Sequence, residues 1–331
     1  MNQYLNPYTD QNFFTFFWVF AQRVWGFFSG EISFSSLSSD ELQVFVLVGV
    51  SASSALVGTF LILRKMTMLA NALSHTILLG IAVVYLLFAS LSFPLLLLAA
   101  LATGALTTFL TDFLVRVVKL QKDASIGLVF NLLFALGILL VSLFCRNTHL
   151  GTELIMGNVD ALQKSDLSLV FTILGINLSL ILLLFPGYTL TTFDPKLARS
   201  FGISPTFFQY LLMVQTSFTA IGAFRAVGVI MVLSFIVAPP LTARLFTHTL
   251  STLLWLSVGI GSLASFIGVA LSRHIFTYFG VGLSTGGIVV TLLALFYILA
   301  LLFTRLRLQL AQASLSPQQK TRSPQEIQEQ M

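Results

Sequence analysis

Nine long segments of this 331-residue chain contain no Asp, Glu, Lys or Arg. A helix crosses the hydrocarbon core of a bilayer with about 20 consecutive apolar residues. Only 9% of the residues are charged, whereas soluble proteins carry about 25%, so this chain cannot cover a water-facing surface. The sequence therefore predicts an all-α fold, a polytopic transmembrane helical bundle of about nine spans. These are Leu42–Leu63, Met66–Ala89, Phe93–Thr111, Ser125–Cys145, Leu167–Gly187, Thr206–Phe224, Ala226–Ala243, Leu250–Ser272 and Gly282–Thr304.

The distribution of cations between the segments predicts the orientation. Cytoplasmic loops carry an excess of Lys and Arg. If Arg64 and Lys65 are cytoplasmic and the segments alternate, the loops and tail on that side hold twelve of the 17 cations. This bias predicts an extracytoplasmic N-terminus, a cytoplasmic C-terminus and an odd number of spans. The scattered cations also exclude a nucleic-acid-binding face, although the chain is basic overall.

The two ends of the chain differ from the apolar middle. Residues 12–28 are aromatic but interrupted by Gln22 and Arg23, which favours an interfacial helix; an additional span remains the alternative. The last residues are polar and rich in Pro and Gln, as in disordered segments. We therefore expect an extracytoplasmic segment at 1–41, a transmembrane domain at 42–306 and a disordered cytoplasmic tail at 307–331.

One polar pair interrupts the second apolar segment. Asn71 and His75 lie four residues apart, which places both on one helix face. Polar side chains in hydrocarbon are costly and face the bundle interior or a water-filled path. Two interpretations remain open. The pair can hold helices together through hydrogen bonds, or the neutral imidazole can bind a passing metal ion, with the amide oxygen as a weaker ligand.

The sequence around this pair resembles the permease subunits of ATP-binding-cassette importers for zinc, manganese and iron. That family has an Arg-Arg/Lys pair, a Met and then a Gly-Asp-x-Leu-x-His stretch. The matching residues here are Arg64, Lys65, Met66, Leu73 and His75, whereas Ala70 and Asn71 replace the Gly and the Asp. The amide offers a dipole where the family has a full charge, so the resemblance alone does not identify the metal.

Four further stretches resemble the family in the same order along the chain. They are "DASIGLVFNLLFALGI" (123–138), "LIMGNVDALQKSDL" (154–167), "VGVIMVLSFIVAPPLTARLFT" (227–247) and "GLSTGGIVVTLLALFYIL" (282–299). In the last, Ser284 stands where the family usually has Pro. The likeness covers about residues 42–306, and it is the ordered series rather than any single motif that makes it specific.

The resemblance implies an ABC-importer permease fold in the bacterial inner (cytoplasmic) membrane. It implies import of manganese, zinc or iron, with His75 and Asn71 along the metal path. The expected partners are cytoplasmic ATPase subunits, a second permease copy or a paralogue, and an extracytoplasmic metal-binding protein. No permanently bound cofactor is expected, because the metal is cargo and ATP binds the partner subunit. The absence of a GxxxxGK[ST] phosphate loop from the sequence agrees with a transport subunit that is not itself an enzyme.

A polar stretch at 191–208 resembles the short coupling helix that docks such permeases on their ATPase. Asp194, Ala198 and Gly202 recur every four residues, and we expect them to form a thin face that enters a groove of the ATPase.

The sequence disfavours two other classes of protein. An ion-coupled secondary carrier requires acidic residues within spans, and the nine predicted segments contain none. An intramembrane metalloprotease requires a His-Glu-x-x-His cluster, which the sequence lacks.

Overall fold

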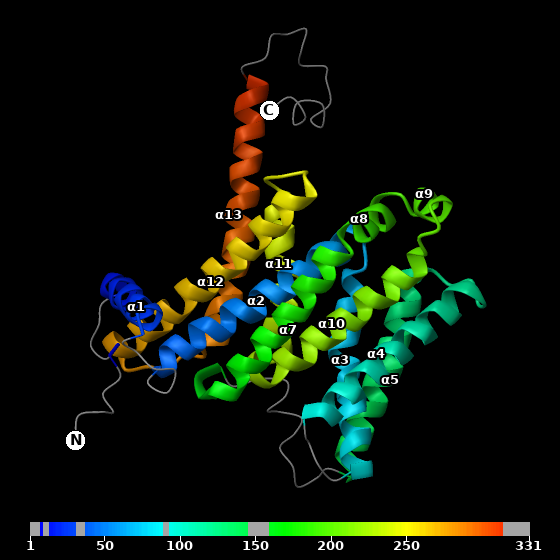
Figure 1. Ribbon diagram of the computed structural model, residues 1–331, viewed down its shortest axis with the longest axis horizontal. Coiled ribbons are helices and arrows are strands. Elements are labelled where there is room, and N and C mark those ends of the chain that lie inside the picture. The colour runs from blue at the N-terminus through cyan, green and yellow to red at the C-terminus, as the bar shows by residue number, and fades with distance from the viewer. Residues whose placement is uncertain (1–6, 9–12, 31–36, 89–92, 145–158, 314–331) are drawn as a thin grey trace.

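The computed structural model describes residues 7–8, 13–30, 37–88, 93–144 and 159–313. Every regular element in these ranges is a helix (Figure 1). The elements are α1 (Phe13–Phe28), α2 (Ser39–Leu63), α3 (Thr67–Phe88), α4 (Phe93–Arg116), α5 (Lys122–Phe144), the 3₁₀ turn η2 (Val159–Ala161), α7 (Lys164–Leu183), α8 (Phe185–Phe193), α9 (Pro195–Ser200), α10 (Pro205–Val227), α11 (Val229–Arg244), α12 (Leu250–Phe279) and α13 (Thr285–Ala313).

The predicted fold class is confirmed. Within the described ranges, eight helices are long and apolar enough to cross a membrane. The seventh predicted segment, 226–243, corresponds to α11, which is shorter, with 16 residues, and contains Pro239 and Pro240. Gly228, with φ +80°, separates α10 from α11, because a residue without Cβ adopts this backbone conformation at little cost.

Several helix boundaries differ from the sequence prediction, and three of these differences change its interpretation. The segment 167–187 is two helices, because Pro186 stands in the first turn of α8 and cannot continue α7. Helix α4 continues to Arg116, so Asp112 lies inside a candidate span, although the nine predicted segments contain no acidic residue. The candidate spans α2, α5 and α7 also include acidic residues in their first turns, namely Asp40, Glu41, Asp123 and Asp166. Helix α13 continues to Ala313, so residues 307–313 are helical rather than part of a disordered tail. The remainder of that tail, 314–331, lies outside the described residues.

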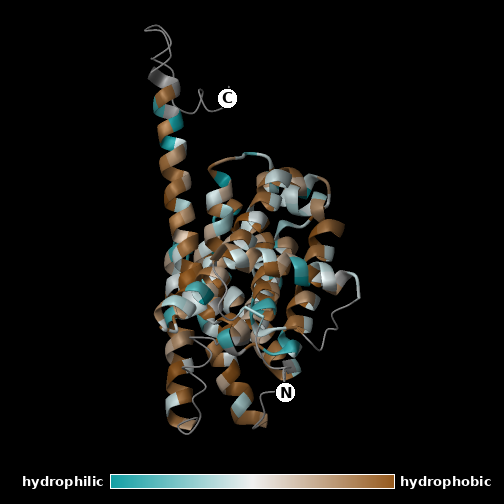
Figure 2. Ribbon diagram, turned by 90° about the vertical axis from the view of Figure 1, so that its left-hand side faces the viewer, coloured by the Kyte–Doolittle hydropathy of each residue, from teal (hydrophilic) through white to brown (hydrophobic). Residues whose placement is uncertain are grey.

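Helix α2 is the centre of the bundle. Of its 18-residue apolar window, 89% is buried, against 22% for α5 and 17% for α13. It contacts α7, α10, α11 and α12, while α3, α4 and α5 pack on one another to one side (Figure 1). In Figure 2, α13 projects beyond the other helices, apolar along most of its length and more hydrophilic toward its end.

Small residues allow α2 to approach its neighbours closely. A Cβ on Gly58 would lie 2.0 Å from the backbone oxygen of Ile236 in α11, and a Cβ on Gly261 of α12 would lie 2.0 Å from Ser51 Oγ. Such contacts are typical of helix pairs in lipid, where association depends on van der Waals packing. The fully buried Asn177 of α7 adds polar contacts, since its Nδ2 donates to Ser53 Oγ at 2.8 Å and to Thr219 Oγ1 at 2.6 Å.

Residues before and within α1 bind the first turn of α2. Tyr8 OH donates to Glu41 Oε1 at 2.8 Å, and the Arg23 guanidinium also bonds to this carboxylate. Burial, together with the nearby Glu41 carboxylate, raises the pKa of the Tyr8 phenol. Arg273 of α12 lies 3.7 Å from Asp40. These contacts hold Tyr8 and α1 against the start of α2, and they join α12 to the same part of α2.

Helix α1 is not among the eight candidate spans. It lies beside α12 (Figure 1), with the rings of Phe17 and Phe20 against Phe266 at centroid distances of 5.0 and 4.7 Å. Trp18 and Trp25 on this helix are exposed. Its position at the membrane interface stays a prediction.

The close approach at Gly58 generates a stability prediction. Gly58→Ala places a methyl group against the backbone of α11, which has no flexible side chain to move aside. We expect a loss of about 1–3 kcal/mol in the free energy of unfolding, as for other overpacked sites. Thermal unfolding of the purified chain in detergent measures the effect. Gly175→Ala on α7 is the control, because no atom lies within 4 Å of its added Cβ. Equal melting temperatures for the two variants would contradict the packing described.

Candidate functional site

The helix that carries Asn71 and His75 begins after a short turn. Arg64 caps α2, and Lys65 adopts a left-handed conformation with φ +54°. The Lys65 amide donates to Ile62 O at 3.0 Å and the Met66 amide to Leu61 O at 2.8 Å. This pair of bonds is the Schellman motif, which ends a helix sharply. Helix α3 starts at Thr67, directly after it.

His75 is half-buried at the contact between α3 and α5. Its ring lies 5.5 Å from the ring of Phe130 and 5.4 Å from that of Phe134, measured between centroids. The two phenylalanines stack on each other at 5.7 Å. The imidazole is therefore held by aromatic contacts from α5 while part of its surface stays accessible.

Asn71 lies one turn before His75 on the same helix and is also half-buried. Among the described residues, no group of three or more His, Cys, Asp or Glu is placed to hold a metal ion. One imidazole and one amide are fewer ligands than a divalent transition metal takes. A complete site at His75 would therefore need ligands from water or from outside the described part of this chain.

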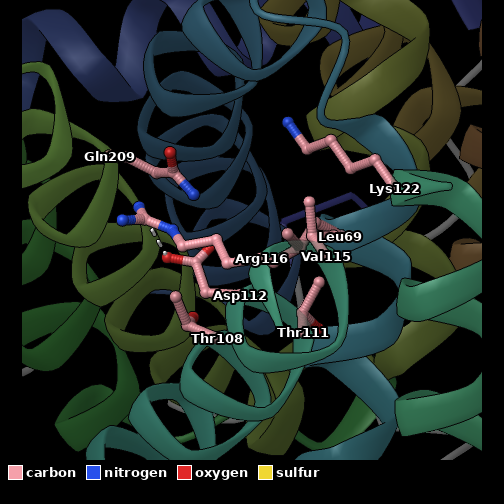
Figure 3. A pocket seen from close by; sticks show the side chains of 8 residues that line it. All are labelled: Leu69, Thr108, Thr111, Asp112, Val115, Arg116, Lys122 and Gln209. Carbon is pink, nitrogen blue, oxygen red and sulfur yellow. Dashed lines mark hydrogen bonds and ion pairs between the residues drawn. The ribbon is translucent and has the colours of Figure 1, made fainter. Parts of the chain in front are cut away.

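A cavity of about 200 Å³ opens between the start of α3, the end of α4 and the starts of α5 and α10, which are the helix ends that the sequence predicts to face the cytoplasm. Figure 3 shows Asp112 beside Arg116, with Gln209 pointing toward them and Lys122 on the other side. Asp112 accepts from Arg116 at 3.4 Å and from Tyr210 OH at 3.2 Å. Arg116 pairs with this carboxylate and Lys122 lines the same cavity, and the two positive charges disfavour a divalent cation there. Neither Asn71 nor His75 lines this cavity.

Near the start of α2, a second cavity, of about 540 Å³, is lined by polar side chains that include Asp40, Asp160 and Arg273. Asp160 accepts from Thr285 Oγ1 at 2.7 Å and from Gln43 Nε2 at 3.4 Å. The carboxylates of this cavity are engaged by protein donors, and these bonds join the loop before α7 to α2 and α13.

The segment predicted to couple to an ATPase forms helix α9. Asp194 is its N-cap, and Asp194 Oδ1 accepts from the amides of Lys196 at 3.0 Å and Leu197 at 2.9 Å. Ala198 is fully buried. Gly202 ends the helix with φ +76°, in a second Schellman motif. The three residues thus start, anchor and end α9, and Ala198 faces inward rather than outward with the other two. Their role in coupling to an ATPase stays a prediction.

The outward face of α9 consists of other residues. Phe201 is 69% exposed and Leu197 is 44% exposed, and Lys196, Arg199 and Ser200 are exposed beside them. An exposed aromatic ring next to cations is typical of a protein-binding surface. The sequence contains this signal, because Leu197 and Phe201 are the two large apolar residues of "DPKLARSFG" (194–202) and lie four residues apart.

Helix α8, which leads into α9, is fixed to α2 and α10. Arg64 Nε donates to Thr192 Oγ1 at 2.9 Å, and Arg64 Nη2 donates to Thr191 Oγ1 at 2.6 Å. Burial lowers the pKa of the Arg64 guanidinium. The two threonine hydroxyls accept the hydrogen bonds that water would accept from an exposed guanidinium. Tyr188 is fully buried and its OH donates to Gln215 of α10.

Comparisons with known proteins agree with this architecture. The model of the ABC 3 transport family matches residues 42–304. A probable metal transport system membrane protein of Chlamydia trachomatis is 41% identical over 90% of this chain and 94% of its own length. The manganese transport system membrane protein MntD of Bacillus subtilis is 37% identical over 67% of this chain and 79% of its own length. The solved structure of PsaBC from Streptococcus pneumoniae in complex with Fab superimposes with a TM-score of 0.68 at 27% identity, over 78% of this chain and 89% of that chain.

Proposed function

We propose, from the premise that the chain belongs to the ABC 3 transport family, that it is the membrane-spanning permease subunit of an ATP-driven importer for a divalent transition metal. The observation that carries the proposal is the family match over residues 42–304, which spans the whole helical bundle. The metal is manganese, zinc or iron, because similar proteins are named for the transport of manganese, zinc and iron. The chain is the multi-pass membrane subunit of the transporter, and a separate partner subunit hydrolyses ATP to drive transport.

The orientation follows from the cation distribution. Arg64, the α9 cations and Arg244 lie on the cytoplasmic side, and α1 with the Asp40–Arg273 pair lies outside. In this orientation α9 faces the cytoplasm, where the ATPase subunits dock. The extracytoplasmic metal-binding protein meets the opposite end of the bundle.

His75 is the group on this chain that contacts the metal during passage, with Asn71 as a weak neighbour. The half-accessible imidazole, on the same helix face as Asn71, supports this role. A second permease copy or a paralogue that brings its own side chains to the same path would complete the coordination. An incomplete site on each subunit also suits transport, since an ion that is bound too tightly leaves slowly.

The ATPase contact is the outward face of α9, formed by Leu197 and Phe201 with the cations between them. Asp194, Ala198 and Gly202 determine where this helix starts, how it is anchored and where it ends. Their role in coupling is therefore to present Phe201 rather than to touch the partner themselves.

The metal-path role predicts the behaviour of two substitutions. His75→Leu should lower metal uptake per folded transporter at least about 10-fold, since even groups that only support a ligand change metal affinity by about 10–100-fold. Asn71→Asp should strengthen metal binding, because a full charge replaces a dipole. Uptake of radioactive manganese by the complete transporter in liposomes, divided by folded protein, measures both.

A purely structural role gives the reverse pattern. His75→Leu would then reduce the amount of folded protein and leave uptake per molecule unchanged, and Asn71→Asp would destabilise the bundle by burying an unpaired charge. Unchanged uptake per folded molecule in His75→Leu would remove His75 from the metal path.

The docking role of α9 predicts the effect of a charge at its exposed ring. Phe201→Asp should weaken ATPase binding by about 2 kcal/mol, as for an interface hot spot, which is roughly 30-fold. Co-purification and titration of the ATPase subunit measure this loss. Phe246→Asp is the matched control, because Phe246 is also half-exposed, on the same predicted side, after α11. Equal ATPase affinity of both variants and the wild type would exclude α9 as the docking surface.

A further inference from the structure

We propose that Arg64 is a positioning residue that links the ATPase-facing segment α8–α9 to the base of α3, so that movement of α9 reaches the helix that carries Asn71 and His75. The proposal rests on the function proposed above, and it adds a residue and a route for the coupling of ATP hydrolysis to metal release. It depends on three features of the structure: the fork of Arg64, the rigidity of α8 and the shortness of the turn into α3.

The guanidinium of Arg64 spans two successive hydroxyls of α8. The bonds to Thr191 Oγ1 and Thr192 Oγ1 are 2.6 and 2.9 Å long. Each hydroxyl in turn donates to a carbonyl of its own helix, Thr191 to Gly187 O at 2.7 Å and Thr192 to Tyr188 O at 2.6 Å. Because the hydroxyl protons are used inside α8, the oxygen lone pairs are available to Arg64. The arrangement suits the planar fork of arginine, which a lysine ammonium does not reproduce.

Helix α8 is rigidly attached around this contact. Tyr188 is buried against Phe60 of α2 at 5.0 Å and against Phe208 of α10 at 5.1 Å, measured between ring centroids. The Arg64 guanidinium carbon lies 6.0 Å from the centre of the Tyr188 ring. A Cβ on Gly187 would lie 2.2 Å from the Phe208 ring, so α8 and α10 are in close contact. Force on α8 therefore moves it as one body with its neighbours.

Few residues separate Thr192 from α9, and few separate Arg64 from α3. Thr192 precedes the N-cap of α9 by two residues, and Arg64 precedes Thr67, the first residue of α3, by three. The intervening turn is held by the Schellman bonds of Lys65 and Met66. A displacement of α9 is thus transmitted across two hydrogen bonds and one tight turn, without a flexible loop.

The test removes the acceptors and leaves Arg64 in place. Thr191→Val with Thr192→Val keeps the size of both side chains but deletes the oxygens that Arg64 contacts. The complete transporter, with its ATPase subunits and a manganese-loaded binding protein, is placed in liposomes. Manganese imported per ATP hydrolysed should fall about 5-fold or more, the size of a typical coupling energy between sites. ATP hydrolysis and ATPase co-purification should persist, because the outward face of α9 is unchanged.

Two further variants separate coupling from stability. Thr189→Val removes a hydroxyl of the same helix that donates to Phe185 O at 2.8 Å and that Arg64 does not contact, so its import per ATP should equal that of the wild type. Arg64→Lys keeps the charge without the fork and should fall between the wild type and the double variant. If the double variant lowers import and hydrolysis in proportion, so that the ratio is unchanged, Arg64 has only a structural role and the proposal is overturned.

A second readout does not depend on transport. Binding of the ATPase subunit should change amide hydrogen exchange in residues 67–75 of the wild-type chain and of Thr189→Val, and leave it unchanged in the double variant. The same response in the double variant, or no response in the wild type, overturns the link through Arg64. A wild-type complex that shows this response but imports no metal contradicts the proposed function alone.

Discussion

The close approach of backbones around α2 is the constraint on which the rest of the structure depends. Lipid gives helices no hydrophobic reason to associate, so small residues and internal hydrogen bonds must hold them together. Gly58 against the backbone of Ile236 and Asn177 between Ser53 and Thr219 supply both kinds of contact. With α2 fixed in this way, its two ends become fixed points. One end holds the α1 segment through Glu41, and the other holds α8 through Arg64.

The helices could be predicted from the sequence because apolar length alone determines a span. The breaks between consecutive helices could not be predicted from apolar length. Pro186 divides one apolar run into α7 and α8, and Gly228 separates α10 from α11, although hydropathy continues across both. Asp112 lay one residue beyond the predicted end of its segment, and only the structure shows it one turn inside α4, bonded to Arg116 and Tyr210. An acid near a helix end with such partners is weak support for an ion-coupled carrier, and the family match decides against that alternative.

The candidate site was predictable in part. A step of four residues places Asn71 and His75 on one helix face, but no pattern indicates that Phe130 and Phe134 of α5 contact the imidazole. Similarly, the step that joins Asp194, Ala198 and Gly202 indicates a short helix at α9. It does not show that Ala198 faces inward and Phe201 outward, because six residues are too few for a periodic apolar pattern to decide. The contact of Arg64 with α8 spans more than 120 positions of the chain and has no local signal.

The central claim is that His75 of this permease contacts the metal in passage. X-ray absorption at the zinc edge, on the assembled wild-type transporter trapped with Zn²⁺ in the membrane, tests that claim most directly. If His75 binds the ion, at least one imidazole nitrogen should lie at about 2.0–2.1 Å from the metal. A shell of oxygen atoms alone, or no metal retained within the membrane subunits, would contradict it.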